Sequence, residues 1–240
     1  MPFTFSHPAL VLPLTYLPKK YYSLTGLIIG SLTPDFEYFI RMKVQSNYGH
    51  TLAGIFYFDL PLGILLAFIF HNLIRDSLYK NLPGFLKDRL TSFQNFDWNR
   101  FFISNWIAIT TSIIIGAASH LLWDSFTHKF GYFVETLPVL TTRINLFGYQ
   151  IPFYNILQHS STLIGGLIIL HAFFKLPVNI GDQISIDLRY WAVLILLSLI
   201  ILVIRFLTGL DIRLFGQVIV TVISATLISL ALTPILLKKK

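Results

Sequence analysis

The chain has 240 residues, of which 55% are apolar and only 12% charged, with a mean hydropathy of +0.69. Soluble domains carry about 25% charged residues, so this composition excludes a soluble globular protein and indicates a chain that folds in lipid. The net charge of +7 is explained by basic residues that flank apolar segments and bind anionic headgroups. The absence of cysteine excludes disulfides and thiolate chemistry.

Six apolar segments follow one another along the chain. Ser23–Leu32, bounded by Lys19-Lys20 and Pro34-Asp35, is too short to span a bilayer and is predicted to be an interfacial or re-entrant helix. A helix needs about 20 residues to cross the hydrocarbon core. Five later segments are long enough, near Leu52–Leu73, Phe102–Phe126, Tyr154–Phe174, Tyr190–Leu207 and Phe215–Leu237. The predicted fold class is therefore all-α, a polytopic helical membrane protein.

Charge and glycine patterns extend this prediction. The loop 74–101 has the densest cluster of Lys and Arg, and the chain ends in Lys238–Lys240, so both are predicted to be cytoplasmic. Residues 1–51 and the loop 127–153 then face the extracytoplasmic side. Glycines at 26–30 and at 165–166 are predicted to let helices pack closely.

Ionisable residues are concentrated before the last two segments. Residues 1–176 are predicted to form a membrane-embedded core that carries a His/Asp pocket. Residues 177–240 are predicted to add two transmembrane helices, which serve as a scaffold or as a subunit contact in a homo-oligomer. Polar side chains within apolar segments are costly and commonly functional, so the polar residues of the core are the candidates for a site.

The second long segment carries His120, Asp124 and His128 at successive i, i+4 positions, which lie on one helical face. Asp59 and His159, on two other segments, are predicted to lie at a matching depth. The N-terminal region, on the same side, adds His7, Asp35, Glu37 and His50.

Imidazole and carboxylate are the ligands of zinc and other divalent first-row metals, so these residues predict a metal site of one or two ions. Structural alternatives stay open for single elements of it. His120 and Asp124 could form an ordinary i, i+4 hydrogen bond, and Asp35 could be a turn or N-cap residue before Phe36–Ile40.

The motifs that contain these residues resemble known families. The segments concerned are Met1–Pro8, Gly30–Phe39, Phe58–Pro61 and Ser119–His128. Together they resemble a bacterial membrane family catalogued as domain of unknown function 4184, over most of the chain. More distantly, the early His, the Pro-Asp-x-acid motif, a His before a hydroxyl residue and the Gly116–Gly131 run resemble membrane-bound metal-dependent hydrolases. That pattern often has a second histidine near His50, which this chain lacks.

The hydrolase resemblance implies a divalent metal, zinc or manganese, and metal-assisted hydrolysis in which the ion activates water. Because the pocket is predicted near one membrane face, a lipid or lipid-linked ester or phosphodiester is the expected substrate. The resemblance implies His7, Asp35, His50, His120 and Asp124 as ligands, His128 and His159 as further ligands or orienting side chains, and Asp59 or Glu37 as general base.

Two other functions stay open. A proton- or cation-coupled transporter would also bury Asp and His in the membrane, although its site would usually lie nearer the midplane between repeated halves, and the sequence has no internal repeat. A non-catalytic membrane scaffold would tolerate the loss of these side chains one at a time. In each case we expect a multi-pass protein of the bacterial plasma membrane, with lipids as partners, no nucleic acid, and the pocket on the extracytoplasmic side.

Overall fold

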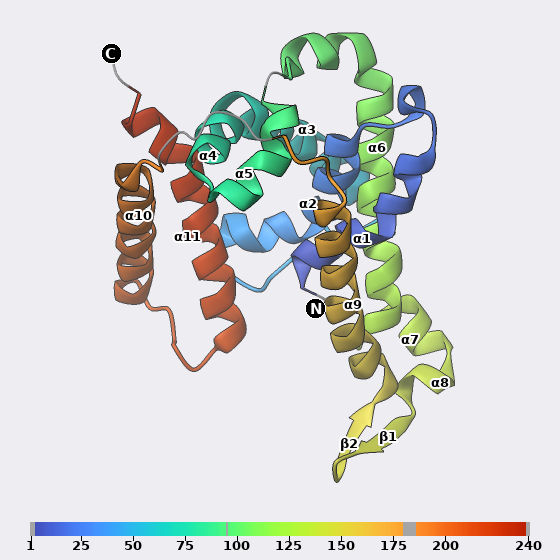
Figure 1. The fold of residues 1–240 in the computed structure, drawn as a ribbon. Coiled ribbons are helices and arrows are strands. Elements are labelled where there is room, and N and C mark those ends of the chain that lie inside the picture. Colours follow the sequence, from blue (N-terminus) through green and yellow to red (C-terminus); the bar gives the residue numbers. More distant parts are fainter. Residues whose placement is uncertain (1–2, 95, 180–185, 239–240) are drawn as a thin grey trace. The chain divides into compact units, whose positions relative to one another are not determined.

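A computed structural model of the protein describes residues 3–94, 96–179 and 186–238. Met1 and Pro2 of the opening motif, residues 180–185 of the C-terminal part, and Lys239 and Lys240 of the basic end lie outside the described residues. Within the described ranges the chain is mainly helical, with one small β-hairpin (Figure 1). This confirms the predicted all-α class.

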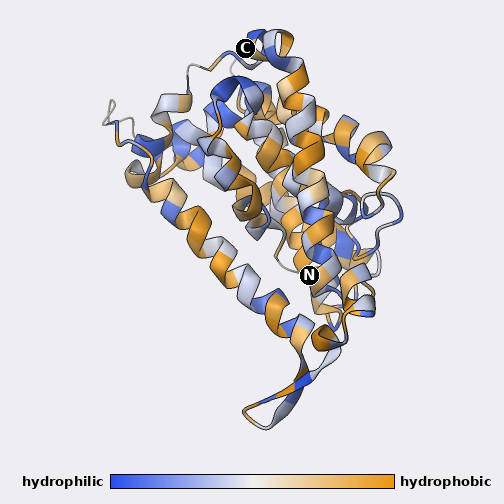
Figure 2. Ribbon diagram, turned by 90° about the vertical axis from the view of Figure 1, so that its right-hand side faces the viewer, coloured by the Kyte–Doolittle hydropathy of each residue, from blue (hydrophilic) through white to orange (hydrophobic). Residues whose placement is uncertain are grey.

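Helices that are long and apolar enough to cross a membrane coincide with the five predicted segments. Hydrophobic residues run along the lengths of the long helices, as Figure 2 shows. The observed bounds are Ile55–Asn81, Trp98–Thr136, Phe153–Phe174, Leu188–Leu207 and Phe215–Leu236. The first two extend further at their C-terminal ends than predicted, because short helices that end at Asn81 and Thr136 follow there. A polytopic membrane protein is thus the class that both sequence and structure support.

The chain divides into two compact units. The first comprises Met1–Asp35, Asn47–Ile64 and Asn105–Phe174, and the second comprises Phe36–Ser46, Leu65–Ser104 and Lys175–Lys240. The first unit lies wholly within the predicted core 1–176, whereas the two C-terminal helices belong to the second. The functional division at residue 176 stays a prediction.

The first unit holds the N-terminal segment, parts of three long helices and the hairpin. Its N-terminal elements are a 3-10 turn at Thr4–Ser6, α1 (Pro8–Val11), 3-10 turns at Leu12–Tyr16 and Lys19–Tyr21, and most of α2 (Leu24–Arg41). A π-helical turn at Ile55–Asp59 leads into α3 (Leu60–Ile69), and then come most of α6 (Trp98–Thr127), α7 (Tyr132–Thr136), α8 (Pro138–Thr141), β1 (Arg143–Leu146), β2 (Tyr149–Pro152) and α9 (Phe153–Phe174).

The hairpin was missed by the sequence analysis, which left 127–153 as a loop. Its strands pair antiparallel, with Leu146 opposite Tyr149. The connecting Phe147 and Gly148 both have positive φ, 51° and 85°, as the tight turns of two-residue hairpins require.

Helix α2 corrects a prediction. The expected helix was bounded by Pro34, but the observed helix has 18 residues and contains Pro34 in its interior. A proline at this position leaves the carbonyl of Gly30 without its usual backbone donor. The hydroxyl of Thr33 donates to that carbonyl instead, at 2.8 Å, so the helix continues. Asp35 is therefore an interior helical residue, and the alternative of a turn or N-cap role was wrong.

Helices α2 and α6 cross at backbone contact within the first unit. A Cβ on Gly30 would collide with the backbone of Ile113, and a Cβ on Gly116 would lie 2.6 Å from the carbonyl oxygen of Leu27. Glycine on both helices is what allows this approach. The predicted role of the 26–30 glycines is thus confirmed. Gly165 likewise faces the backbone of Ser6, whereas Gly166 has open space around it.

The second unit contains the remaining helices. They are the end of α3, a π-helical turn at Phe70–Ile74, α4 (Arg75–Asn81), α5 (Gly84–Leu90), a 3-10 turn at Thr91–Phe93, the start of α6, α10 (Leu188–Leu207) and α11 (Phe215–Leu236). Helix α11 packs along α10. Its small residues Thr221, Ala225, Ser229 and Thr233 recur every fourth position and are all buried, so this face is used for packing inside the unit.

Buried Arg75 organises the other end of the second unit. Its guanidinium donates to the backbone carbonyls of Phe96 and Gln94 at 2.7 and 3.2 Å and pairs with Asp76. The ring of His71 stacks on Trp98 at 4.5 Å. These contacts satisfy a buried cation within its own unit, which gives it a structural role.

Candidate metal centre

Helix α6 supplies two of the candidate ligands from one face. His120 and Asp124 are one turn apart and both buried. The Nδ1 atom of His120 lies 2.8 Å from the backbone carbonyl oxygen of Ser31. A carbonyl can only accept, so Nδ1 carries the hydrogen and Nε2 carries the lone pair when the ring is neutral. This is how many proteins orient a metal-binding imidazole, and the close crossing of α2 and α6 makes it possible here.

Asp35 on α2 is fully buried and faces the same space. Its Oδ2 atom accepts a hydrogen bond from the hydroxyl of Thr4 at 2.5 Å, which fixes the carboxylate and leaves Oδ1 turned toward the histidines. Burial acts to raise the pKa of Asp35, but the charges of His120 and His50 and the Thr4 hydrogen bond outweigh it and hold that pKa below its ordinary value. Asp35 is therefore a carboxylate, the form that binds cations.

His50 reaches the site from the loop after α2. A Cβ on Gly49 would lie 2.6 Å from the carbonyl oxygen of Pro34, so glycine lets this loop lie against α2. His50 Nε2 is then 3.3 Å from Asp35 Oδ1 and 3.5 Å from Asp124 Oδ2. Burial acts to lower the pKa of His50, but the two carboxylates outweigh it and raise the pKa to about 9. The two acids thus attract positive charge to this point.

Four atoms from these residues form a compact set of alternating nitrogen and oxygen. His120 Nε2 lies 3.6 Å from Asp35 Oδ1 and 3.4 Å from Asp124 Oδ2, which with the two His50 distances closes a ring of four N···O separations between 3.3 and 3.6 Å. These are longer than good hydrogen bonds. Ligands bound at about 2.0–2.2 Å to a tetrahedral zinc lie roughly 3.3–3.6 Å apart, so each of these four N···O separations matches that between two ligands of one ion. Asp35 and Asp124 do not belong to the same set of potential ligand atoms within 4.8 Å of one another.

The imidazole of His7 is a fifth candidate ligand beside these four residues. Its ring stacks on that of His120 at 3.7 Å and 12°, and its Nε2 lies 3.6 Å from Asp124 Oδ1. Burial, reinforced by His120, lowers the pKa of His7 to about 3, so the ring is neutral. We call His7, Asp35, His50, His120 and Asp124 the five-residue cluster.

Unsatisfied atoms in the five-residue cluster test whether it fits a cation. Among the described residues, both ring nitrogens of His7, Nε2 of His120 and one oxygen each of Asp35 and Asp124 are buried without a hydrogen-bond partner. Buried polar atoms are normally bonded, and a bound cation would satisfy these nitrogen and oxygen atoms together. Potential ligand atoms within 4.8 Å of one another occur in the sets His7–Asp35–His120 and His50–His120–Asp124. The donor set therefore fits a divalent metal.

His128 lies beside the cluster. Its Nδ1 is 3.1 Å from the backbone oxygen of Asp124 and 3.4 Å from Asp124 Oδ1. Since the backbone oxygen accepts, Nδ1 is a donor, and this nitrogen is directed at Asp124. Of the two predicted roles, the contacts favour orienting Asp124.

Three residues that were predicted for the site, Asp59, Glu37 and His159, lie outside the five-residue cluster. Asp59 is fully buried at the end of the π-helical turn. Glu37 belongs to the second unit, where it accepts from Arg41 at 2.8 Å and from Ser46 at 2.9 Å. His159 on α9 is exposed. Asp59, Glu37 and His159 are absent from both metal-competent sets of described residues.

The sequence analysis missed the groups that position the ligands. The Thr4 hydroxyl, the Ser31 carbonyl and the glycine at 49 each hold one ligand in place. Thr4 stands three residues before His7 and could have been suspected. A backbone carbonyl carries no sequence signal, because every residue has one.

Comparison with known proteins identifies a family. A family model described as a domain of unknown function (DUF4184) matches residues 1–235, nearly the whole chain and both of its units. No match is found among curated proteins or among solved structures.

Proposed function

The chain belongs to the DUF4184 family, whose function is unknown, and from the five-residue cluster we propose that it is a metal-dependent hydrolase of the membrane. The observation that carries the proposal is the ring of four N···O separations between 3.3 and 3.6 Å among His50, His120, Asp35 and Asp124. Structural hydrogen bonds alone would draw these atoms closer together.

We propose that these four residues hold one divalent ion, with His7 as a fifth ligand. A mixed set of imidazole nitrogen and carboxylate oxygen favours zinc, with manganese as the alternative. A single ion is favoured over two because His120 has only Nε2 to offer, Nδ1 being bonded to Ser31, and both metal-competent sets include His120.

A divalent ion in such a site polarises an ester or phosphodiester and activates water against it. The protein's own contribution is to hold the ligands and to take up the proton that water loses. Asp59 is the better of the two candidate bases, because it is buried in the same unit as the cluster whereas Glu37 is paired with Arg41. Hydrolysis adds the elements of water across the cleaved bond, so no other co-reactant is needed.

The proposed substrate is a lipid or lipid-linked ester or phosphodiester. Two cluster residues, His120 and Asp124, stand near the C-terminal end of α6, at a depth that headgroup linkages reach. The proposed location is the bacterial plasma membrane with the centre toward the extracytoplasmic side, supported by the basic loop 74–101 on the opposite flank of the first two spans.

The test is hydrolysis of bis(4-nitrophenyl) phosphate and of a diacyl phospholipid by detergent-purified protein, with and without added zinc. We expect zinc-dependent cleavage. Asp124→Asn should lose both bound zinc and activity, whereas Asp59→Asn should keep the zinc and lose most of the activity. Glu37→Gln, its matched control, should keep both.

Metal-loaded protein that cleaves neither compound, and no other ester or phosphodiester in a panel, would overturn the hydrolase proposal. The buried acids and histidines would then be assigned to ion or proton movement. Equal activity of Asp59→Asn and Glu37→Gln would remove Asp59 as the base.

A further inference from the structure

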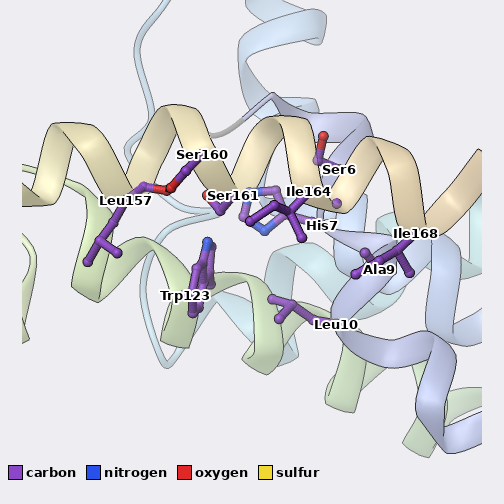
Figure 3. Close-up of a pocket in the computed structure, with 11 residues that line it drawn as sticks. Ser6, His7, Ala9, Leu10, Trp123, Leu157, Ser160, Ser161, Ile164 and Ile168 are labelled. Atoms are coloured by element: carbon purple, nitrogen blue, oxygen red, sulfur yellow. The ribbon is translucent and has the colours of Figure 1, made fainter.

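A cavity of about 250 Å³ lies in the first unit, beside the five-residue cluster. The N-terminal segment, α6 and α9 enclose it, and His7 forms part of its wall (Figure 3). His7 belongs to the five-residue cluster and its ring is stacked on that of His120, so the cavity borders the candidate metal ligands directly.

Along α9 the cavity is lined by two serines between apolar residues. Ser160 and Ser161 line it toward the start of the helix, and Ile164 and Ile168 line it further on, opposite Leu10. Hydroxyl groups suit the linkage region of a lipid, and branched aliphatic side chains suit its hydrocarbon. Leu157, nearer the start of α9, and Gly165 complete the lining from this helix.

The cavity lining on α9 is about as long as one leaflet is thick. The lining residues on α9 run from Leu157 to Ile168, which at 1.5 Å per residue is about 16 Å along the helix. The hydrocarbon of one leaflet is about 15 Å thick. A chain lying in the cavity would thus be aligned like the acyl chains of neighbouring lipids.

The cavity wall is also part of the surface that faces lipid. Ile164 and Ile168 are 55% and 44% exposed although they line the cavity, and α9 is one of the five helices able to span the membrane. An apolar cavity that opens on a lipid-facing helix is filled from the membrane, where acyl chains are the abundant apolar groups.

We propose that this cavity binds one acyl chain of a membrane lipid and so presents the lipid's ester or phosphodiester linkage to the five-residue cluster. The inference rests on the proposed hydrolase function and adds to it an acylated substrate and the place where its chain lies. His7, which lines the cavity and belongs to the five-residue cluster, would stand next to the linkage.

The experiment uses the full chain in lipid nanodiscs of phosphatidylethanolamine and phosphatidylglycerol, doped with a phosphatidylcholine that carries a diazirine in one acyl chain. After illumination, labelled residues are mapped by peptide mass spectrometry. We expect label on Trp123 and on Ala9, which is buried yet lines the cavity, besides label on the outer surface of α9.

A substitution that fills the cavity distinguishes labelling inside the cavity from labelling by general lipid contact. Ser161→Phe should reduce the label on Ala9 and Trp123 several-fold and leave surface labelling unchanged. The control Leu163→Phe, two residues along α9 at an exposed position outside the cavity lining, should leave both unchanged. The unsubstituted chain alone tests the inference if Ser161→Phe does not fold.

Label confined to exposed residues, or equal effects of Ser161→Phe and Leu163→Phe, would overturn the acyl-chain site. Because labelling requires neither metal nor turnover, its failure leaves the cleavage of bis(4-nitrophenyl) phosphate as an independent measure of the hydrolase. Conversely, cavity labelling in a chain without any zinc-dependent cleavage would support lipid binding and reject the hydrolase.

Discussion

At the scale of single residues, the candidate centre depends on which nitrogen of each histidine is available. The bond from His120 Nδ1 to Ser31 directs Nε2 at Asp35 and Asp124. The Thr4 hydroxyl does the same for Asp35, because it occupies Oδ2 and leaves Oδ1 for the centre. Groups that orient ligands in this way contribute to affinity although they touch no metal.

Thr4→Val tests this role, since it removes the hydroxyl and keeps the shape of the side chain. We expect zinc affinity to fall by roughly 10–100-fold, measured by competition with a chromophoric chelator at fixed pH. Thr136→Val is the matched control, because the Thr136 hydroxyl is exposed and bonds only within its own helix, to Tyr132. Equal affinities of the two variants would show that Thr4 does not support the site.

At the scale of elements, the long helices were predictable and the details of α2 were not. Length and apolar content determine whether a segment can cross a bilayer, so all five spans were found to within a few residues at most ends. Pro34 was taken as a boundary because proline normally interrupts helices. Thr33 bonds the freed carbonyl of Gly30, and this local compensation becomes evident only from the geometry.

The crossing of α2 and α6 at Gly30 predicts that a single methyl group will disturb the centre. Gly30→Ala gains about 1 kcal/mol of helix propensity but places a Cβ against the backbone of Ile113, where overpacking costs about 1–3 kcal/mol. We expect a lower unfolding temperature and reduced zinc content. Gly166→Ala, on a helix with open space around it, should show neither change. Identical behaviour of the two variants would contradict the proposed role of the crossing.

At the scale of the whole molecule, the five-residue cluster joins the N-terminal segment, α2, the loop after α2, and α6. All five were among the candidates found from the sequence, because His and Asp within an apolar chain are few and conspicuous, and the resemblance to metal-dependent hydrolases implied these five as ligands. His159 was predicted from its depth along α9, but depth gives no information on which way a helix face points, and His159 is exposed. Glu37, two residues from Asp35, is paired with Arg41 in the second unit.

The most direct test of the account is the metal content of the purified chain, measured by inductively coupled plasma mass spectrometry after dialysis without chelator. We expect about one zinc or manganese per chain, lost in both Asp35→Ala and His120→Ala, whose positions are far apart in sequence, and retained in His159→Ala. A wild-type chain that holds no metal even after reconstitution with zinc or manganese, or one that keeps its metal in both variants, would contradict the proposed centre.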